Sequence, residues 1–469
     1  MKIDTIEVCT LRSKCHMTKL ITSLFFLFLI LIFLNIKSSP SLDLYSLSSK
    51  SWGLMGRWQR TSKSRNMVSM LQESVTFLPL KDLRFSENPT SGNTWFMSSL
   101  NDTQEENEAE HLYFPSDASK GRVLCIKGRD TRDGTKNSYA LAWPEALPDL
   151  ATLLKGLTFV SDTYYNHENL WHGVCATIPF VRWSMKNNCI RPDRWALFHW
   201  GELRLKMGSW IEQLMRVNFG EVYVEGFNNG SDIPYCFEKV VIMRHDLGRL
   251  GLENKLKVSD HLRCKARKYC EINPIGRGVE VNERGEPIIR FTLLLRRGSR
   301  SFKNSTSVTE IFAKECAKIQ GCILNVVQSE DLNFCDQVRV MTQTDVVASP
   351  HGAQLTNMLF MDRNSSIMEF FPKGWLEHAG AGQYAHHWMA NQSGMKHQGA
   401  WWDPIGDECP SPKHDAECFS FYKNGKVGHN ETLFAEWSRK VIEEVRQGKI
   451  EQMSKIKLNP TKDCGCLHS

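Results

Sequence analysis

Residues 286–371 alternate between strand-length apolar runs and helix-length amphipathic segments, and this alternation limits the possible folds more than any other feature. The apolar runs are 288–295, 322–327, 346–348 and 366–371. Ser307 and Glu310 form a capping-box pattern that predicts the start of one helix, and Gly321 ends it. A second helix is expected over 331–343. Such alternation predicts a parallel sheet with helices on both faces.

The turn that follows the third run has the features of an anion site. Residues 345–357 read D-V-V-A-S-P-H-G-A-Q-L-T-N, and a short helix is expected from Ala353 to Met361. Unpaired backbone N–H groups at a helix start attract negative charge, and Gly352 lets the backbone approach a phosphate closely. His351 and Thr356 could donate hydrogen bonds beside it. The alternative is a turn needed only for folding.

A basic turn follows the first run. Residues 296–304 read R-R-G-S-R-S-F-K-N, and Arg296 and Arg300 could clamp a diphosphate because guanidinium pairs with phosphate in a bidentate way. The alternative is a solvated basic loop. Because both turns follow strands of the same predicted sheet, we expect them at the same sheet edge, where α/β sheets bind ligands.

Three of these segments and one upstream element resemble glycosyltransferase family 61, especially its plant members. The residues that carry the resemblance are L-L-L-R-R-G-S-R-S-F-K-N (293–304), D-V-V-A-S-P-H-G-A-Q-L-T-N (345–357), S-I-M-E-F-F-P (366–372) and N-L-W-H (169–172). The last is similar to the family's Asn-x-x-His element. The resemblance spans roughly residues 95–450.

The resemblance implies an α/β protein of the GT-B class, with two Rossmann-like domains facing a cleft. We expect an acceptor-side domain at 96–250, a charged and loop-rich connection at 251–285, and a nucleotide-sugar-binding domain at 286–430. A C-terminal helix and tail would occupy 431–469. In the acceptor-side domain, strands are expected at 122–126, 157–160, 195–198, 221–224 and 239–243, with helices after His172 and over 203–217.

The resemblance also implies an inverting transferase. It would move a pentose, xylose or arabinose, from a UDP-sugar onto a cell-wall polysaccharide such as xylan or onto another glycan. Donor contacts are expected from Arg296, Arg300, His351, Gly352, Ala353, Thr356, Asn357 and Glu369. Glu369, carried over from the family, would accept hydrogen bonds from the ribose, and Asn357 would brace the turn.

The catalytic base is not settled by the family pattern. Many relatives carry an aspartate directly after the histidine of Asn-x-x-His, or a few residues on, whereas this chain continues His172-Gly-Val-Cys-Ala-Thr. His172 is therefore the first candidate because imidazole titrates near neutrality, and Glu168 is the second. A buried structural histidine is the alternative reading of His172.

No metal and no other cofactor is expected, with the UDP-sugar as a substrate. An Asp-x-Asp triplet does not stand at the end of any expected strand, and D-T-R-D at 130–133 has the wrong spacing. The formal charge of +6 is spread along the chain without a dense basic block, so nucleic acid is not an expected partner.

An apolar run near the N-terminus, Leu20–Leu34, lies between Lys19 and Lys37. We expect a cytosolic tail at 1–19, a transmembrane signal anchor at 20–36 and a stem at 37–95, with a cleaved signal peptide as the alternative. This arrangement predicts a single-pass type II protein of the Golgi membrane with a lumenal body. A homo- or hetero-oligomer in the Golgi is a further expected partner state.

A lumenal body would carry glycans and disulfides. Glycosylation is expected at Asn101, Asn229, Asn364, Asn391 and Asn430, whereas Asn304, inside the basic turn, is expected to stay unmodified. Of the 15 cysteines, Cys9 and Cys15 precede the apolar run. The local pairs open to disulfides are Cys264–Cys270, Cys316–Cys322 and Cys409–Cys418, and the odd lumenal count leaves at least one thiol unpaired.

Two functions of different classes remain open. The first is the glycosyltransferase; the second is a catalytically lapsed, membrane-anchored glycan-binding or scaffold protein, which needs the nucleotide turn but no base. A hydrolase with paired carboxylates finds no support, because no acid pair lies in a motif context.

Overall fold

The computed structural model describes residues 67–80, 111–163, 167–228, 232–243, 251–273, 280–412, 415–453 and 464. All of them belong to one compact unit, Asn66–Ser469. The expected membrane anchor at 20–36 lies outside the described residues, as do most of the stem and the tail. Among the described residues, no helix is both long and apolar enough to cross a bilayer.

The C-terminal half is built on a five-stranded sheet in which every neighbouring pair is parallel. In spatial order its strands are β10 (Cys322–Gln328), β9 (Ile289–Leu295), β11 (Val346–Pro350), β12 (Ser366–Phe371) and β13 (Lys396–Trp402). The helices that pack on it are α6 (Ser305–Ala317), α7 (Phe334–Thr342), α9 (Ala385–Gln392) and α11 (Glu431–Met453). The predicted parallel sheet is thus confirmed.

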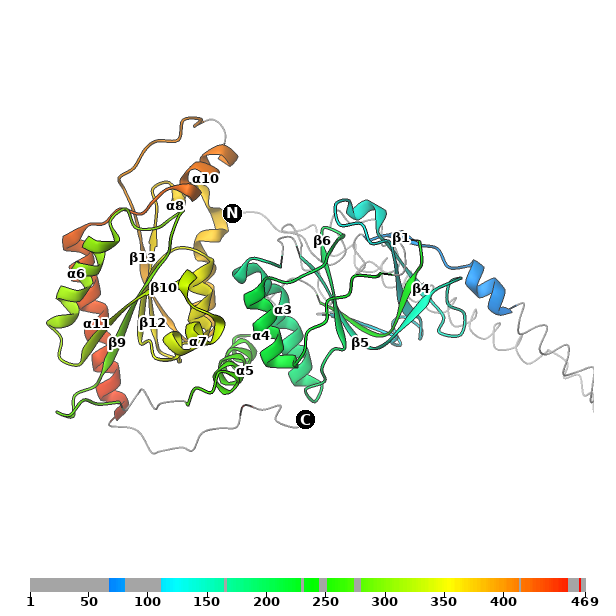
Figure 1. Ribbon diagram of the computed structural model, residues 1–469, viewed down its shortest axis with the longest axis horizontal. Helices are drawn as coiled ribbons and strands as arrows, with labels where there is room; N and C mark the ends of the chain where they lie inside the picture. The colour runs from blue at the N-terminus through cyan, green and yellow to red at the C-terminus, as the bar shows by residue number, and fades with distance from the viewer. Residues whose placement is uncertain are drawn as a thin grey trace, which may run out of the picture. The chain divides into compact units, whose positions relative to one another are not determined.

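Helices cover both faces of this sheet, because its strands alternate apolar side chains between two cores. Phe291, Val346 and Phe370 pack with α6 and α11, whereas Val347 and Ile367 face the core that contains residues of α7 and α9. Figure 1 shows α6 and α11 on one side of the strands and α7 on the other. Strands buried on both faces need continuous apolar runs, which is why they were recognisable in the sequence.

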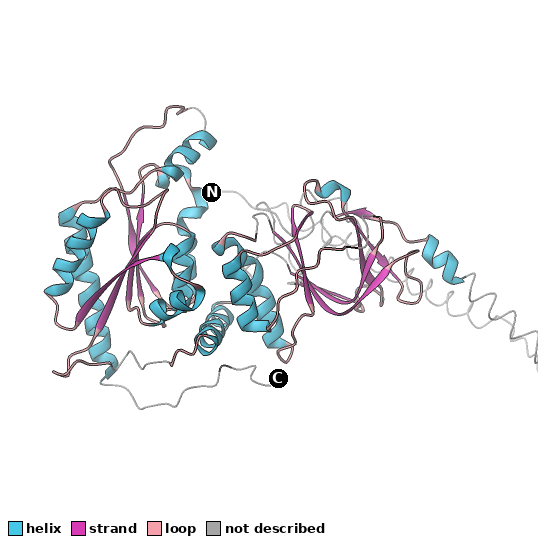
Figure 2. Cartoon of the chain, in the orientation of Figure 1, coloured by secondary structure: helices cyan, strands magenta, loops and turns pink. Residues whose placement is uncertain are grey.

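The N-terminal half contains an eight-stranded sheet that is mixed, not the parallel sheet of a Rossmann-like domain (Figure 2). Its strands are β1 (Leu78–Pro79), β2 (His111–Phe114), β3 (Val123–Lys127), β4 (Ser138–Ala142), β5 (Thr152–Thr163), β6 (Arg194–His199), β7 (Glu202–Arg204) and β8 (Tyr235–Met243). β5 runs parallel to β6 and β8, and the remaining pairings are antiparallel. The hairpins β3–β4 and β6–β7 make the sheet mixed, since a short turn can join only antiparallel strands.

Three helices accompany this sheet, and they are α3 (Leu170–Lys186), α4 (Ser209–Phe219) and α5 (Leu252–Tyr269). The expected helix at 203–217 is therefore displaced, since its first residues form β7. The expected strand at 221–224 is reduced to an isolated bridge between Trp195 and Val224. The loop-rich connection expected at 251–285 is wrong over α5, where Val258, Leu262 and Ala266 form a narrow buried stripe.

Smaller elements complete the C-terminal half. They are α8 (Trp375–His378), α10 (Asp415–Asn424) and the 3-10 helices η3 (Ser329–Asp331), η4 (Ala353–Phe360) and η5 (Gly380–Tyr384), with η1 (Gly134–Lys136) in the N-terminal half. α6 begins two residues before the predicted capping box, because Asn304 is its N-cap and accepts a hydrogen bond from the Ser307 N–H. The helix expected after His351 is the 3-10 helix η4.

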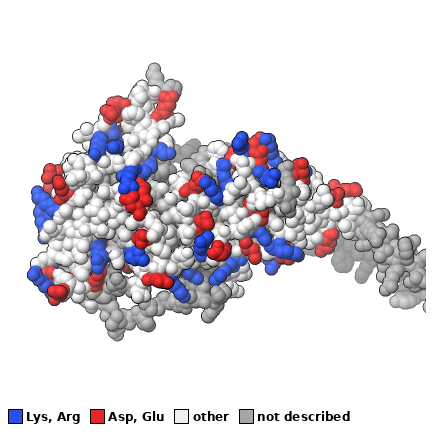
Figure 3. All heavy atoms as spheres, in the orientation of Figure 1, with Lys and Arg blue, Asp and Glu red and all other residues white. Residues whose placement is uncertain are grey.

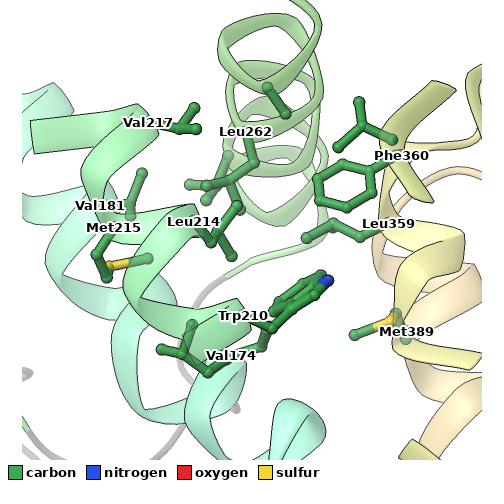
Figure 4. Packing of buried hydrophobic residues seen from close by; sticks show 14 of the residues in the cluster. Val174, Val181, Trp210, Leu214, Met215, Val217, Leu262, Leu359, Phe360 and Met389 are labelled. Carbon is green, nitrogen blue, oxygen red and sulfur yellow. The ribbon is translucent and has the colours of Figure 1, made fainter. Parts of the chain in front are cut away.

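The two halves share one apolar core. Val174 on α3 and Trp210 and Leu214 on α4 belong to the same buried cluster as Leu359 and Phe360 on η4 (Figure 4). Trp210 Nε1 also donates to Asn357 Oδ1 at 3.0 Å. Along this side the halves are therefore packed against each other and leave no open cleft between those residues.

Five disulfides connect described cysteines. The predicted pairs Cys316–Cys322 and Cys409–Cys418 are confirmed. The pair Cys264–Cys270 is wrong, because both cysteines belong to or end α5 and bond elsewhere, in Cys264–Cys464 and Cys270–Cys335. Cys125–Cys236 joins β3 to β8, and Cys175 is the free thiol among the described cysteines, with a pKa raised to about 12 by burial.

The surface shows mixed charge on the face seen in Figure 3, where basic and acidic side chains are interspersed. Among the expected glycosylation positions, Asn364, Asn391 and Asn430 are exposed, and Asn304 is exposed as well. Asn101 and Asn229 lie outside the described residues.

Candidate functional site

The order of the parallel strands determines where a ligand can bind in the C-terminal half. Counted within this sheet alone, the spatial order is 2-1-3-4-5. The connection from β9 passes through α6 on one face, and the connection from β10 to β11 passes through α7 on the other. The carboxyl ends of β9 and β11 therefore flank the topological switch point, where open α/β sheets bind ligands. Arg296 follows β9 and His351 follows β11.

Arg296 connects the two turns directly. Its Nη1 donates to the carbonyl oxygen of His351 at 3.1 Å and to Gln354 Oε1 at 3.2 Å. A Cβ atom on Gly352 would lie 1.9 Å from the same Nη1, so the guanidinium fits only because residue 352 is glycine. Burial lowers the pKa of Arg296, and Glu330 opposes that shift in part.

Arg300 is held in an unusual backbone conformation beside it. Its φ is 59°, a left-handed value that non-glycine residues seldom adopt, and its N–H donates to the Gly425 carbonyl at 2.8 Å. Its guanidinium lies over the ring of Trp375, 5.1 Å from the centroid. Burial and, second, the charge of Arg296 lower the pKa of Arg300 to about 10.

These two cations have no acidic partner. Within the described residues, neither Arg296 nor Arg300 has a carboxylate within ion-pair distance, and the Nε atoms of both are buried without a hydrogen-bond partner. Buried charges are normally paired, since an uncompensated one costs several kcal/mol. Two partly desolvated guanidinium groups, near enough that the charge of Arg296 lowers the pKa of Arg300, are therefore a candidate site for an anion.

Arg297, between them, shows the opposite arrangement. Its Nη1 and Nη2 donate to the two carboxylate oxygens of Asp331, both at 2.7 Å, and it is exposed. Asp331 raises the pKa of Arg297. This arginine is a surface ion pair and is not part of the anion site.

His351 lies beside the arginines with its ring enclosed by aromatic side chains. Its centroid is 4.7 Å from those of Phe371 and Trp375. Its Nδ1 is 2.6 Å from Glu369 Oε1, and His386 Nδ1 is equally 2.6 Å from that oxygen. Burial, opposed by Glu369, lowers the pKa of His351 to about 4, so the ring is neutral at neutral pH.

Glu369 does not occupy the position expected of a ribose ligand. It is 0% exposed, and its second oxygen, Oε2, accepts a hydrogen bond from His397 Nε2 at 3.0 Å. Burial alone would raise the pKa of Glu369, but His386 and His351 hold it well below its usual value. Both oxygens of this carboxylate are therefore hydrogen-bonded to histidines of the fold itself.

His351, Glu369 and His386 also form a set of side chains that could hold a metal ion, because their ligand atoms lie within 4.8 Å of one another. The contacts of 2.6 Å between each Nδ1 and the same oxygen are, however, those of charge-assisted hydrogen bonds. Two ligands of one ion would lie farther apart, at about 3 Å or more for metal–ligand bonds near 2.1 Å. We therefore treat the group as a hydrogen-bonded network.

The remaining residues of the predicted donor site differ in their roles. Ala353 begins η4 at the switch point and is half-buried. Thr356 is 0% exposed, and its Oγ1 is buried without a partner. Asn357 is 1% exposed and uses both ends of its amide within the fold, since Nδ2 donates to the Gln354 carbonyl at 2.9 Å and Oδ1 accepts from Trp210. Asn357 thus braces the turn and does not face a ligand.

The Asn-x-x-His element forms the start of α3. Asn169 is its N-cap, and its Oδ1 accepts hydrogen bonds from the backbone N–H groups of Trp171 and His172. His172 is half-buried in the first turn, while Glu168 is exposed and 3.4 Å from Lys206 Nζ. The ring of Trp171 lies edge-on to His386, 5.9 Å between centroids, so this helix start adjoins the histidine–glutamate network.

Several site residues were not identified from the sequence. Trp375, His386 and His397 were not among the predicted site residues, although the tryptophans and histidines of residues 375–402 were a usable signal. On the acceptor side, Asp162 ends β5 and is 1% exposed, close in sequence to the buried His167. A polar Ser-Asp-Thr ending to a long apolar strand could have drawn attention to Asp162.

A cavity of about 630 Å³ adjoins the arginine turn. It lies beyond the end of β12, and its lining includes Lys303, Lys373, Tyr422 and Gly425. Gly425 is the residue whose carbonyl accepts the Arg300 N–H, so the cavity and the anion site share a wall. Its volume is within the range of small-molecule sites.

Residues 146–368 match the model of a protein family described as Glycosyltransferase 61. The match includes the Asn-x-x-His element, both turns of the switch point and the first half of β12, and it ends one residue before Glu369. No curated protein matched the sequence.

Solved structures show distant likeness only. An oxidoreductase from Corynebacterium diphtheriae is 10% identical, with a TM-score of 0.23, and the alignment covers 35% of this chain and 98% of that one. The flavodoxin of Streptococcus pneumoniae TIGR4 is 9% identical, with a TM-score of 0.19, and covers 36% of this chain and 99% of its own. The Flv1 flavodiiron core of Synechocystis is 9% identical, with a TM-score of 0.23 and coverage of 47% and 44%. These scores carry no structural argument.

Proposed function

This chain belongs to glycosyltransferase family 61 through residues 146–368, and we propose that it is an inverting enzyme whose donor is a nucleotide sugar. The observation that carries the proposal is the pair of partly buried arginines at the switch point of the parallel sheet, which have no ion-pair partner among the described residues. A nucleoside diphosphate supplies the two negative charges that Arg296 and Arg300 lack. The cavity beside Gly425 is the space for the rest of the donor.

The two arginines would stabilise the leaving diphosphate. As the bond between the sugar and the phosphate breaks, negative charge grows on the departing oxygen, and guanidinium groups that are already in place and already desolvated stabilise it without reorganisation. A hydrogen bond between charged groups contributes about 1.5–3 kcal/mol. This electrostatic role is the one for which other transferases use a metal ion, so we propose that the reaction needs none.

The acceptor hydroxyl must lose its proton as it attacks the anomeric carbon. We place the base on the acceptor side, at the start of α3, with His172 as the first candidate and Glu168 as the second. His172 is supported by its half-buried position in the turn that touches the network around Glu369. Glu168 is less favourable, because it is exposed and paired with Lys206.

The finer assignment follows the resemblance to plant members of the family. The donor would be UDP-xylose or UDP-arabinofuranose and the acceptor a cell-wall polysaccharide such as xylan, in the Golgi lumen, with the N-terminal run as a type II anchor. The exposed positions of Asn364, Asn391 and Asn430 and the five disulfides support a lumenal body.

A second function keeps one observation in its favour. The Asn-x-x-His element has no carboxylate after the histidine, and the nearest one before it, Glu168, is occupied by Lys206. A chain of this kind could bind a nucleotide sugar or a glycan without transferring it.

A turnover screen separates these possibilities. The full-length chain is incubated with a series of UDP-sugars, with and without xylan oligosaccharides, and UDP release is measured for the wild type and for R300A. We expect acceptor-dependent UDP release from a UDP-pentose that falls at least ten-fold in R300A. UDP binding without release from any donor would favour the scaffold, and failure to bind any UDP compound would remove the proposal.

A further inference from the structure

The carboxylate of Glu369 joins three elements beneath the anion site. It is fully buried on β12, and it accepts hydrogen bonds from His351 after β11, His386 on α9 and His397 on β13. Two of these reach the same oxygen, Oε1, at 2.6 Å each. Moving an ionised carboxylate out of water costs several kcal/mol of solvation, and hydrogen bonds such as these three offset that cost.

The charge of Glu369 determines which nitrogen of His351 carries the proton. An ionised carboxylate can only accept hydrogen bonds, so Nδ1 of His351 must be the donor. The ring is neutral, since burial lowers the pKa of His351 to about 4 despite the opposing effect of Glu369. In a neutral imidazole with a proton on Nδ1, the other nitrogen, Nε2, has a lone pair and no hydrogen.

That second nitrogen is available to a ligand. Within the described residues, Nε2 of His351 has no hydrogen-bond partner and is not fully buried. Nε2 of His386, by contrast, is buried without a partner among the same residues. The charged or titratable groups that face the ring are Glu369, His386 and the guanidinium of Arg300, while Arg296 binds the backbone carbonyl of His351.

This protonation state changes the role of His351. A bare nitrogen cannot donate to a phosphate oxygen, so the ring is not the phosphate ligand that the sequence suggested. It can accept a hydrogen bond from a hydroxyl group, and a nucleotide sugar has hydroxyl groups on its ribose and on the transferred sugar, directly next to the diphosphate.

We propose that Glu369 is a positioning residue that fixes His351 as the hydrogen-bond acceptor for a hydroxyl group of the bound nucleotide sugar. The inference rests on the proposed donor site. It divides that site into two functions: Arg296 and Arg300 bind the diphosphate through charge, and His351 selects for a hydroxyl at a set distance from it. The two histidines that share Glu369 with His351 hold the carboxylate in place from α9 and β13.

The test measures the affinities of ligands that differ in their hydroxyl groups. Inorganic pyrophosphate, UDP, 2′,3′-dideoxy-UDP and UDP-xylose are titrated by calorimetry into the full-length wild type, H351F and E369Q. H351F keeps an aromatic ring against Phe371 and Trp375 but removes Nε2, and E369Q removes the charge with little change of shape. His387→Phe is the matched control, because His387 is exposed, makes no hydrogen bond to Glu369 and touches the network only through a ring contact with His397 that a phenyl ring can keep.

We expect H351F to bind pyrophosphate like the wild type and to lose roughly three- to ten-fold in affinity for the hydroxyl-bearing ligand, the effect of one neutral hydrogen bond. A loss already seen with UDP, together with loss of the preference for UDP over its dideoxy form, identifies the ribose. A loss seen only with UDP-xylose identifies the transferred sugar. E369Q should reduce the same preference, and the control should not change it.

Two results would overturn the inference: an equal loss for pyrophosphate and UDP, which would make His351 part of the phosphate site, or unchanged preferences in H351F. Nitrogen-15 NMR of histidine-labelled wild type provides a measurement that needs no variant to fold. We expect the signal of the unprotonated Nε2 of one neutral histidine ring to shift when UDP or UDP-xylose is added and not when pyrophosphate is added. If no histidine signal behaves in this way, the inference is contradicted. A wild type that binds pyrophosphate but no UDP compound would instead reject the nucleotide-sugar function itself.

Discussion

The parallel sheet of the C-terminal half and the mixed sheet of the N-terminal half place polar groups in different ways. All five parallel strands end at one edge, so residues that follow different strands, such as Arg296 and His351, meet there. In the mixed sheet the antiparallel neighbours end at opposite edges, and only β5, β6 and β8 run in the same direction as neighbours. Its candidate groups gather around β5 and the start of α3. The difference teaches that a binding site can be inferred from strand endings where strands are parallel, whereas a mixed sheet gives no such rule.

This contrast implies that the C-terminal half binds the donor diphosphate and that the N-terminal half removes the proton from the acceptor hydroxyl. Replacing His172 by Ala should lower turnover by roughly 10²–10⁴-fold if it is the base, with UDP affinity unchanged. The pH–rate profile should lose its acidic limb, because a protonated imidazole cannot accept a proton. Steady-state kinetics and calorimetry on the same variant make the comparison.

Glu168→Gln is the control for that experiment, since it removes the second candidate base from the same turn. Wild-type turnover in H172A together with a large loss in E168Q would transfer the role to Glu168. If H172A loses UDP binding and thermal stability along with activity, His172 is a core residue and the proposed division of labour fails.

Acid should destabilise the fold through the parallel half. The pKa of His351 falls from 6.5 to about 4 on folding, so the unfolded chain binds more protons than the folded one between these values, and stability decreases as the pH falls through this window. Between pH 7 and pH 5 this group alone should remove about 2 kcal/mol. Glu369, with a pKa also lowered on folding, adds a loss only at lower pH.

Urea unfolding at pH 7 and pH 5 measures this effect. H351F should lose less stability than the wild type over the same interval, and the exposed-residue variant H387F should behave like the wild type. A pH dependence that is identical in H351F and wild type would mean that His351 is not buried in its neutral form.

The close approach of the two turns predicts a smaller effect at Gly352. In G352A the added Cβ would lie 1.9 Å from Arg296 Nη1, so the guanidinium must move away from its place. We expect about a ten-fold loss of UDP affinity, equivalent to roughly 1.4 kcal/mol. Gly382→Ala is a matched control because a Cβ there meets no atom within 4 Å. Equal UDP affinities in G352A and G382A would mean that Arg296 does not bind the ligand.

The smallest expected effect is that of metal removal. If arginines and not a metal ion stabilise the leaving group, turnover in EDTA should stay within about two-fold of the untreated enzyme, since a lost catalytic ion removes several kcal/mol of stabilisation. Loss of activity in EDTA that Mn²⁺ restores would contradict the arginine-based account and would draw attention to the histidine–glutamate network as an ion site.

The same contrast explains how much could be predicted from the sequence. The strands β9 to β12 were placed to within one or two residues, because strands buried on both faces are continuous apolar runs. The convergence of Arg296, Arg300, His351 and Gly352 followed from strand endings alone. The helix α5 was missed because its buried stripe contains few apolar residues among many charged ones.

What could not be predicted depends on contacts between distant segments. Cys264 bonds to a residue 200 positions away, whereas the short pair Cys316–Cys322 could be read locally. Glu369 was placed on the correct strand, but its three histidine partners lie on other elements, and only the structure shows that both of its oxygens are hydrogen-bonded within the fold.

The most direct test of the account is a calorimetric titration of UDP into the wild type, R296A, R300A and R297A. The three arginines are close in sequence, yet Arg297 is paired with Asp331 at the surface, whereas Arg296 and Arg300 have no ion-pair partner in the part of the chain that the structure describes. We expect R296A and R300A each to weaken UDP binding ten-fold or more, the loss of at least one charged hydrogen bond of about 1.5–3 kcal/mol, and R297A to stay within about two-fold of the wild type. Equal affinities in all four proteins, or equal losses in the three variants, would contradict the claim that this edge of the parallel sheet binds the donor diphosphate.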